Sequence, residues 1–218
     1  MYIPRDFVED NPEFIRKFIQ THGFGTLVSH DGRRPMASQL LFHLGYGADG
    51  AMQLASHMAR ANPQWRTLER PTDVLVLFQG PHTYVSAAWY SVPSAPTWNY
   101  ITVQAYGRAT LVQDRAELYQ LLKALVDSNE QKSAEDQGFR IESIPTDVLT
   151  NMMDGIVGFR IAVSQTRCAA KLSQNRNDAD YGNIVEKLRD RSDPQSQAIA
   201  VEMERRRQPR KNRGGRSE

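Results

Sequence analysis

Residues 25–44 read GTLVSHDGRRPMASQLLFHL, and this stretch decides the fold class. Runs rich in apolar and β-branched residues stand on both sides of an Asp31-Gly32 turn, which is typical of two strands joined as an antiparallel hairpin. A glycine-rich turn over residues 45–50 and another strand-like run continue the pattern. The sequence therefore predicts an antiparallel meander with strands over residues 25–30, 35–44 and 51–56.

More strand-like runs follow along the chain. They cover residues 74–78, 83–89, 98–112 and 155–166. The dipeptide Gly80-Pro81 indicates a turn between the first two of these runs. Gly107 interrupts the third run and indicates a bend or bulge that helps a sheet to curl closed. About six antiparallel strands predict a small closed barrel and not a fold of alternating strands and helices.

Helices are expected between and after these strands. Asn11 followed by Pro12 begins the first helix, because Asn caps well and Pro suits the first turn. A second helix, of about two turns, begins at Asn62. Asp114 with Glu117 begins a strongly amphipathic helix. A polar stretch over residues 128–137 and helices over residues 146–153, 180–189 and 194–207 complete the chain. The predicted fold is mainly β with helical additions, the last two at the C-terminus.

Size and composition fit one main domain. The chain has 218 residues, 40% of them hydrophobic and 24% charged, close to the average for globular proteins. It has no run of about 18 apolar residues and no basic or apolar leader at its N-terminus, so we expect no membrane partner and a cytoplasmic location. Cys168 is the single cysteine. We interpret it as a free thiol in a strand, since a reducing compartment suits such a chain and no activating base is near it in sequence.

The charge is distributed unevenly along the chain. The net charge is +2, yet residues 205–216 contain seven Lys and Arg and no acid. Subtracting these seven from the 27 Lys and Arg leaves 20 basic against 25 acidic residues, a net charge of −5. We expect a mildly acidic domain over residues 1–207 and a basic, disordered tail over residues 208–218. Attraction to nucleic acid would then depend on the tail.

Several strong enzymatic signatures are missing from the sequence. It contains no HExxH, CxxC, GxSxG or Walker-type GxxxxGK[ST] pattern, which excludes the commonest hydrolase, zinc and nucleotide-triphosphate motifs. The histidines are His22, His30, His43, His57 and His82. They show no repeated ligand spacing, so we expect no structural metal.

Three polar clusters stand at the ends of predicted strands, each beside an aromatic residue. They are residues 56–65 (SHMARANPQW), 96–100 (PTWNY) and 171–176 (KLSQNR). The Arg, hydroxyl groups and helix-start amides of the first cluster suit a dianionic phosphate. An aromatic wall from Trp98 and amides such as those of Asn99 and Gln174 suit a flat heteroaromatic ring. The alternative is structural: Asn62 caps a helix, Trp98 belongs to the core, and residues 171–176 form a solvated loop.

These clusters and other motifs resemble the PaiB-type FMN-binding negative transcriptional regulators, relatives of the pyridoxamine-phosphate-oxidase-like split barrels. The resemblance is carried by MYIP (1–4), GFGTLV (23–28), NPQW (62–65), FQGPH (78–82), PTWNY (96–100), GIVGF (155–159) and KLSQNR (171–176). These motifs run in family order over nearly the whole chain. The tail beyond about residue 208 departs from the family pattern.

The resemblance implies an antiparallel FMN-binding split β-barrel that works as a homodimer, with one FMN in each of two clefts between the subunits. It implies that the phosphate and ribityl groups are held by Ser38, Gln39, Ser56, His57, Arg60 and Asn62. It implies that Thr97, Trp98 and Asn99 lie beside the flavin. It further implies that Lys171, Ser173, Gln174 and Arg176 approach the cleft, from the same subunit or from its partner.

Three functions remain open at this point. The family resemblance implies a negative transcriptional regulator that responds to flavin state, although the acidic domain and the C-terminal helices offer no convincing element for reading DNA. The second is a flavin-dependent oxidoreductase or flavin reductase acting on a small molecule, with His57, His82 and Tyr100 as candidate acid or base. The third is a module that stores or senses the cofactor without turnover.

Overall fold

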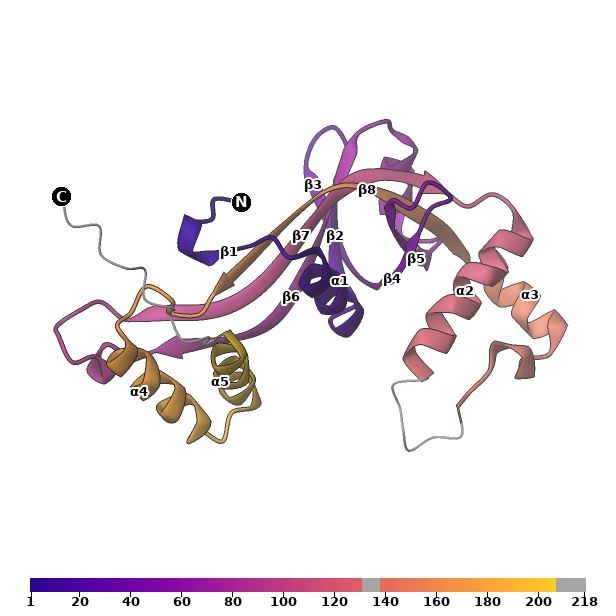
Figure 1. Cartoon of the computed structure of the whole chain (residues 1–218). Coiled ribbons are helices and arrows are strands. Elements are labelled where there is room, and N and C mark those ends of the chain that lie inside the picture. Colours follow the sequence, from indigo (N-terminus) through magenta and orange to yellow (C-terminus); the bar gives the residue numbers. More distant parts are fainter. Residues whose placement is uncertain (131–137, 207–218) are drawn as a thin grey trace. The chain divides into compact units, whose positions relative to one another are not determined.

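The computed structural model describes residues 1–130 and 138–206 (Figure 1). The strands are β1 Val8–Glu9, β2 Phe24–His30, β3 Pro35–Leu41, β4 His43–Tyr46, β5 Met52–Ala59, β6 Asp73–Val85, β7 Thr97–Leu111 and β8 Ile156–Lys171. The α-helices are α1 Pro12–Thr21, α2 Arg115–Glu130, α3 Thr146–Asp154, α4 Asp178–Arg189 and α5 Pro194–Arg206. Short 3-10 helices are η1 Arg5–Phe7, η2 Pro63–Glu69, η3 Ala87–Trp89 and η4 Ile141–Ser143. The end of the predicted polar stretch and the predicted basic tail lie outside the described residues.

The strands form one sheet in the order β3-β2-β6-β7-β8-β5-β4, and β1 pairs with β8. The pairs β2–β3, β2–β6, β4–β5 and β5–β8 are antiparallel. In the first hairpin the register runs from Phe24 opposite Leu41 to His30 opposite Pro35, so the turn falls at residues 31–34 as predicted. The prediction of a mainly antiparallel β fold with helical additions is confirmed.

The chain divides into two compact units. Among the described residues, unit 1 comprises residues 1–9, 80–101 and 169–206, and unit 2 comprises residues 10–79, 102–130 and 138–168. The strands β6, β7 and β8 each contribute residues to both units.

Unit 2 holds the curled part of the sheet. Its two ends are tied together, because Ser56 Oγ of β5 donates a hydrogen bond to the Leu41 carbonyl at the end of β3, at 2.7 Å. The core between the curled strands is aromatic: Phe42 meets the edges of Phe78 and Phe159, with ring centroids 5.7 and 6.3 Å apart. Burial of each such ring contributes on the order of 2 kcal/mol. This packing fixes a half-barrel.

Helix α2 covers one side of unit 2. Asp114 Oδ1 accepts a hydrogen bond from the Glu117 amide at 2.8 Å, so the predicted cap is present. The buried face of the helix presents Leu121 and Leu125 to Ala55 of β5, as its amphipathic pattern predicts.

Two strand predictions were wrong. The run predicted over residues 35–44 is divided at Phe42 into β3 and β4, although the Phe42 amide still donates to the Gly23 carbonyl at 2.8 Å, in the register of the hairpin. The predicted turn at Gly80-Pro81 does not form, because β6 runs through it. The buried positions change from even numbers, ending at Phe78, to odd numbers, beginning at Thr83. The dipeptide therefore marks a phase change within β6, that is, a switch of the buried side from even-numbered to odd-numbered residues.

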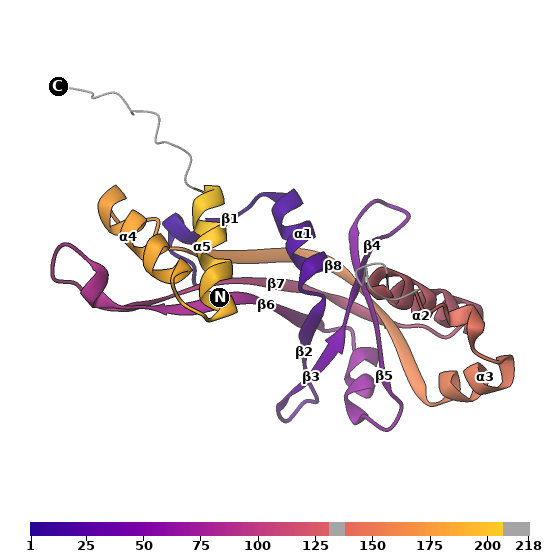
Figure 2. The same ribbon diagram turned by 90° about the horizontal axis from the view of Figure 1, so that it is seen from below.

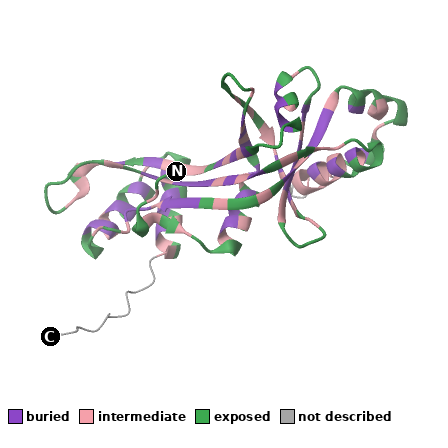
Figure 3. Ribbon diagram, turned by 90° about the horizontal axis from the view of Figure 1, so that it is seen from above, coloured by how far each residue is buried: buried purple, intermediate pink, exposed green. Residues whose placement is uncertain are grey.

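In unit 1, the two C-terminal helices pack against the strands. Figures 1 and 2 show α4 and α5 side by side, and both helices carry buried residues in Figure 3. Ile199 and Met203 of α5 are buried, as their apolar character predicts, whereas Val201 is exposed. The hydroxyls of Thr83 in β6 and Ser196 in α5 are hydrogen-bonded at 2.8 Å, so the helix is anchored to the strand. The hairpin of α4 and α5 thus covers a sheet face.

Candidate functional site

The predicted site residues fall into two groups, one in each unit. Unit 2 contains Ser38, Gln39, Ser56, His57, Arg60 and Asn62. Unit 1 contains Thr97, Trp98, Asn99, Lys171, Ser173, Gln174 and Arg176.

Asn62 organises the unit 2 group. Its side-chain oxygen accepts from the Gln64 amide at 3.0 Å and so caps η2, as predicted. Its side-chain nitrogen donates to Ser38 Oγ at 2.9 Å, across 24 residues of sequence. Asn62 therefore has a structural role, and it also brings the middle of β3 to the end of β5. The Ser38 hydroxyl stays half-buried and keeps its proton available for a further acceptor.

Arg60 and Ser56 are largely occupied by protein partners. The Arg60 guanidinium donates through Nε to the Asp154 carbonyl and through Nη2 to the Ile156 carbonyl, both at 2.9 Å. Arg60 thus satisfies carbonyls at the end of α3 and at the start of β8, and its Nη1 group makes no hydrogen bond with the described residues. The Ser56 side chain is fully buried and serves the tie between β5 and β3. Gln39, by contrast, is exposed on the edge strand.

His57 differs from its neighbours in the unit 2 group. It lies in β5 opposite Gly158 of β8, and its Nδ1 atom is buried without a hydrogen-bond partner among the described residues. Burial lowers the pKa of His57 below its ordinary value of 6.5, because charging the imidazole would cost desolvation. A neutral imidazole carries one donor and one acceptor nitrogen. An unpaired buried nitrogen is costly in a folded protein, so this atom is suited to meet a ligand.

Two of the unit 1 residues, Lys171 and Ser173 at the end of β8, each donate a hydrogen bond to a residue at the start of β7. Lys171 Nζ donates to Thr97 Oγ1 at 2.6 Å and lies 5.8 Å from the ring centre of Phe7. Ser173 Oγ donates to Asn99 Oδ1 at 3.0 Å, and the Asn99 amide nitrogen lies 3.6 Å from the Met203 sulfur. Asn99 and Ser173 are buried. These contacts hold the end of β8 against β7.

The turn after β8 is closed by its own side chains. Ser173 has a φ of 62°, a conformation that residues other than glycine adopt only when their surroundings enforce it. Gln174 accepts from the Leu172 amide at 2.7 Å and donates to the Ala170 carbonyl, so its amide is engaged within the turn. Arg176 stacks over Tyr90 at 3.9 Å and donates to Ser94 Oγ at 2.9 Å. The predicted cleft residues of this turn therefore have structural partners.

Trp98 and Asn99 point to opposite sides of β7, because successive side chains in a strand alternate. Asn99 is buried, whereas Trp98 is 47% exposed. Trp98 stacks on His82 with ring centroids 5.8 Å apart and an interplanar angle of 27°, and Tyr84 lies 6.2 Å from it. We name His82, Tyr84 and Trp98 the aromatic face. Tyr84 was absent from the predicted site, although its position two residues after His82 indicates the same side of a strand.

Other ionisable groups near these elements serve the fold. The Asp180 carboxylate accepts from the Ser91 amide at 2.7 Å, and this bond is the main reason that the pKa of Asp180 is lowered.

No group of three or more His, Cys, Asp or Glu in the described residues could hold a metal ion. Within the same residues, no helix combines the length and the apolar character needed to cross a membrane.

The half-barrel of antiparallel strands in unit 2 places the chain in the class of split barrels. The sequence matches, over residues 1–165, a family described as "Putative FMN-binding domain". It is 40% identical to Protease synthase and sporulation protein PAI 2 from Bacillus subtilis (strain 168), over 94% of this chain and 97% of that protein. The chain belongs to this PaiB-type family of FMN-binding split barrels, and its cofactor is FMN.

Solved structures agree on the fold. The flavocytochrome Anf3 from Azotobacter vinelandii superposes with a TM-score of 0.60 at 14% identity, over 83% of this chain and 78% of that chain. An FAD and heme binding protein from Mycobacterium smegmatis superposes with a TM-score of 0.55 at 17% identity, over 80% and 78% of the two chains. At such identities the likeness concerns the architecture alone.

Proposed function

We propose that this protein is an FMN-binding regulator of gene expression whose state depends on its flavin. The observation that carries the proposal is the unpartnered Nδ1 of His57, buried in β5 of unit 2 among the described residues. A buried polar atom without a partner favours a site that a ligand completes. The regulatory part is supported by the relative that this chain matches over 97% of its length, which is named a protease synthase and sporulation protein.

The unit 2 group supplies groups that suit the polar part of FMN. Ser38 offers a hydroxyl proton, Arg60 offers Nη1, and Gln39 is exposed on the side of β3 opposite to Ser38. Hydroxyl and guanidinium donors are what a phosphate and a ribityl chain require. His57, held neutral by burial, can donate or accept one hydrogen bond at Nδ1. These residues would hold the phosphate and ribityl groups.

The aromatic face and the Lys171–Thr97 pair would serve the flavin ring. A bound FMN supplies the capacity to accept and return electrons. Trp98 offers an exposed aromatic surface, and Lys171 places a positive charge that is fixed by Thr97. Asn99 and Ser173 would act behind them by positioning the ends of β7 and β8.

We further propose that two copies of the chain assemble as a homodimer with FMN at the interface. Tyr84 and Trp98 are 43% and 47% exposed on one sheet face, and contiguous exposed aromatic surface is characteristic of interaction sites. A second copy that covers this face would remove it from water and add a wall to each flavin.

The central experiment is to purify the full chain and record its visible spectrum with and without added FMN. We expect a flavin spectrum with stoichiometric binding, and we expect His57→Ala to weaken FMN binding while an exposed-site control, Gln20→Ala, does not. A colourless protein that takes up no FMN would refute the proposal. For the regulatory part, we expect the FMN-loaded protein to bind one DNA sequence in preference to others at moderate salt.

A second candidate function is a flavin-dependent oxidoreductase acting on a small molecule. The observation that favours it is Trp98, which is 47% exposed and stacked on His82, so that it offers an aromatic surface to a planar substrate as well as to a flavin. Anaerobic addition of a reduced nicotinamide to the FMN-loaded protein distinguishes the two. Rapid, repeated bleaching of the flavin favours the oxidoreductase, and its absence together with DNA selectivity favours the regulator.

A further inference from the structure

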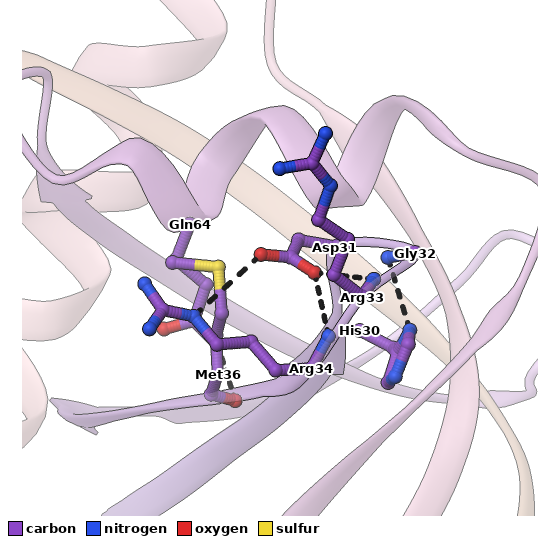
Figure 4. Close-up of polar contacts among 7 residues, drawn as sticks. All are labelled: His30, Asp31, Gly32, Arg33, Arg34, Met36 and Gln64. Carbon is purple, nitrogen blue, oxygen red and sulfur yellow. Dashed lines mark hydrogen bonds and ion pairs between the residues drawn. The ribbon is translucent and has the colours of Figure 1, made fainter.

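The turn between β2 and β3 in unit 2 is held rigid by its own side chains. Asp31 Oδ1 accepts from the amides of Arg33 and Arg34 at 2.7 and 2.8 Å, and His30 Nδ1 accepts from the Gly32 amide at 3.0 Å (Figure 4). The hydrogen bonds that the Arg34 and Arg33 backbone amides donate lower the pKa of Asp31, so its carboxylate stays charged. Two consecutive arginines are therefore presented from a fixed backbone.

A third arginine lies at the same turn. A Cβ atom added to Gly32 would stand 2.9 Å from Arg70 Nη1, so the Arg70 guanidinium lies directly against the turn. Arg70 follows η2, which packs beside the hairpin in the same unit. We name Arg33, Arg34 and Arg70 the arginine turn. All three are exposed.

The positive charge of the arginine turn is only partly neutralised. Arg34 Nε lies 3.9 Å from Asp31 Oδ2, at the limit of an ion pair, and its side chain is 79% exposed. Neither Arg33 nor Arg70 forms an ion pair with any residue that the structure describes. Asp31 is the carboxylate that the structure places within reach of this turn, and its Oδ1 atom is already occupied by two backbone amides. The turn thus offers donors that need an anionic partner from outside.

We propose that the arginine turn binds the phosphate backbone of duplex DNA. Guanidinium groups donate two parallel hydrogen bonds to a phosphate, and a two-stranded antiparallel ribbon fits the width of a DNA groove. A lipid surface is disfavoured, because membrane-binding segments place large apolar residues beside their basic ones and the turn has none. The inference rests on the proposed regulatory function and names the surface through which it would act on DNA.

A DNA contact at the arginine turn belongs to the domain and not to the basic tail. The chain without residues 205–216 carries more acids than bases, so a domain contact must come from a local concentration of charge. The arginine turn is such a concentration. It fixes orientation on the backbone and does not read bases.

The test is DNA binding by the full chain carrying Arg33→Gln and Arg70→Gln. The probe is a labelled duplex of about 30 base pairs, roughly three helical turns, followed by fluorescence anisotropy across a range of salt concentrations. The matched control is Lys17→Gln with Lys187→Gln, which removes the same charge from exposed positions without ion-pair partners among the described residues. A third protein combines the turn substitutions with Arg210→Gln and Lys211→Gln to separate the turn from the tail.

We expect the turn variant to lose about two phosphate contacts. Each lost contact should reduce the slope of the logarithm of the DNA association constant against the logarithm of the salt concentration by roughly 0.9. Between 50 and 200 mM salt the wild type should then weaken by roughly tenfold more than the turn variant, and the control should follow the wild type. Equal slopes for turn variant and wild type overturn this inference and leave the proposed function standing. Absence of any salt-dependent DNA binding overturns both. Binding of anionic vesicles in preference to DNA would reassign the turn to a membrane surface and overturn it as well.

Discussion

Gly107→Ala should open the barrel of unit 2, because at this position the backbone of β8 lies too close for any side chain. A Cβ atom built on Gly107 overlaps the Ala162 carbonyl oxygen and stands 2.8 Å from the carbonyl carbon. The obstacle is backbone inside a strand ladder, which cannot swing aside. Overpacking of this kind costs about 1–3 kcal/mol, and each hydrogen bond lost as the strands separate adds about 1 kcal/mol.

Part of this cost is offset, since alanine loses less conformational entropy than glycine on folding, by about 0.5–1 kcal/mol. With about two ladder hydrogen bonds lost, the net loss is about 3 kcal/mol, which for a chain of this size lowers the Tm by roughly 6–12 °C. The assay is thermal and urea unfolding of the variant. Gly45→Ala in β4 is the matched control, since its nearest neighbour would be the His43 ring at 3.9 Å, and it should be neutral or slightly stabilising.

Gly158→Ala gives an intermediate case. There the added atom would stand 2.5 Å from Leu118 Cδ1, the end of a side chain that can rotate. The expected order of stability is Gly45→Ala, then Gly158→Ala, then Gly107→Ala. A Gly107 variant as stable as the Gly45 variant would refute the reasoning.

Three further outcomes are expected. Because burial lowers the pKa of His57 below 6.5, the unfolded chain takes up its proton first, so stability without ligand should fall as the pH drops below about 6.5, and His57→Gln should flatten this dependence in urea unfolding at several pH values. Asn62→Ala removes the η2 cap and the bond to Ser38 and should cost about 1–2 kcal/mol, whereas an unchanged unfolding midpoint would deny its structural role. Trp98→Ser with Tyr84→Ser should shift the protein toward monomer in sedimentation equilibrium, and an unaffected mass would place the interface elsewhere.

The local signals in the sequence predicted most of the elements. The Asn11-Pro12 start places α1, the Asp114 cap places α2, and Asp31-Gly32 places the first hairpin turn. Each of these depends on residues within a few positions of one another. The Gly80-Pro81 prediction failed, because a proline in a strand is tolerated where its missing amide is not needed for the ladder.

The site residues were harder to interpret, because their partners lie far away in the sequence. Arg60 and its acceptor, the Asp154 carbonyl, are 94 positions apart, and Ser173 and Asn99 are 74 positions apart. No local pattern reveals that these side chains are already engaged. The alternation of strand residues, however, could have separated Trp98 from Asn99, since adjacent residues of a strand face opposite sides.

The phase change in β6 has a consequence for how chain length can vary among relatives. Side chains before Gly80-Pro81 face inward at even positions and those after it at odd positions. Insertion or deletion of one residue here would exchange the sides of Thr83 and Tyr84, moving a buried hydroxyl to the surface and a tyrosine under a helix. Changes of two residues would preserve both sides. Alignment gaps between Gln79 and Thr83 should therefore come in even numbers.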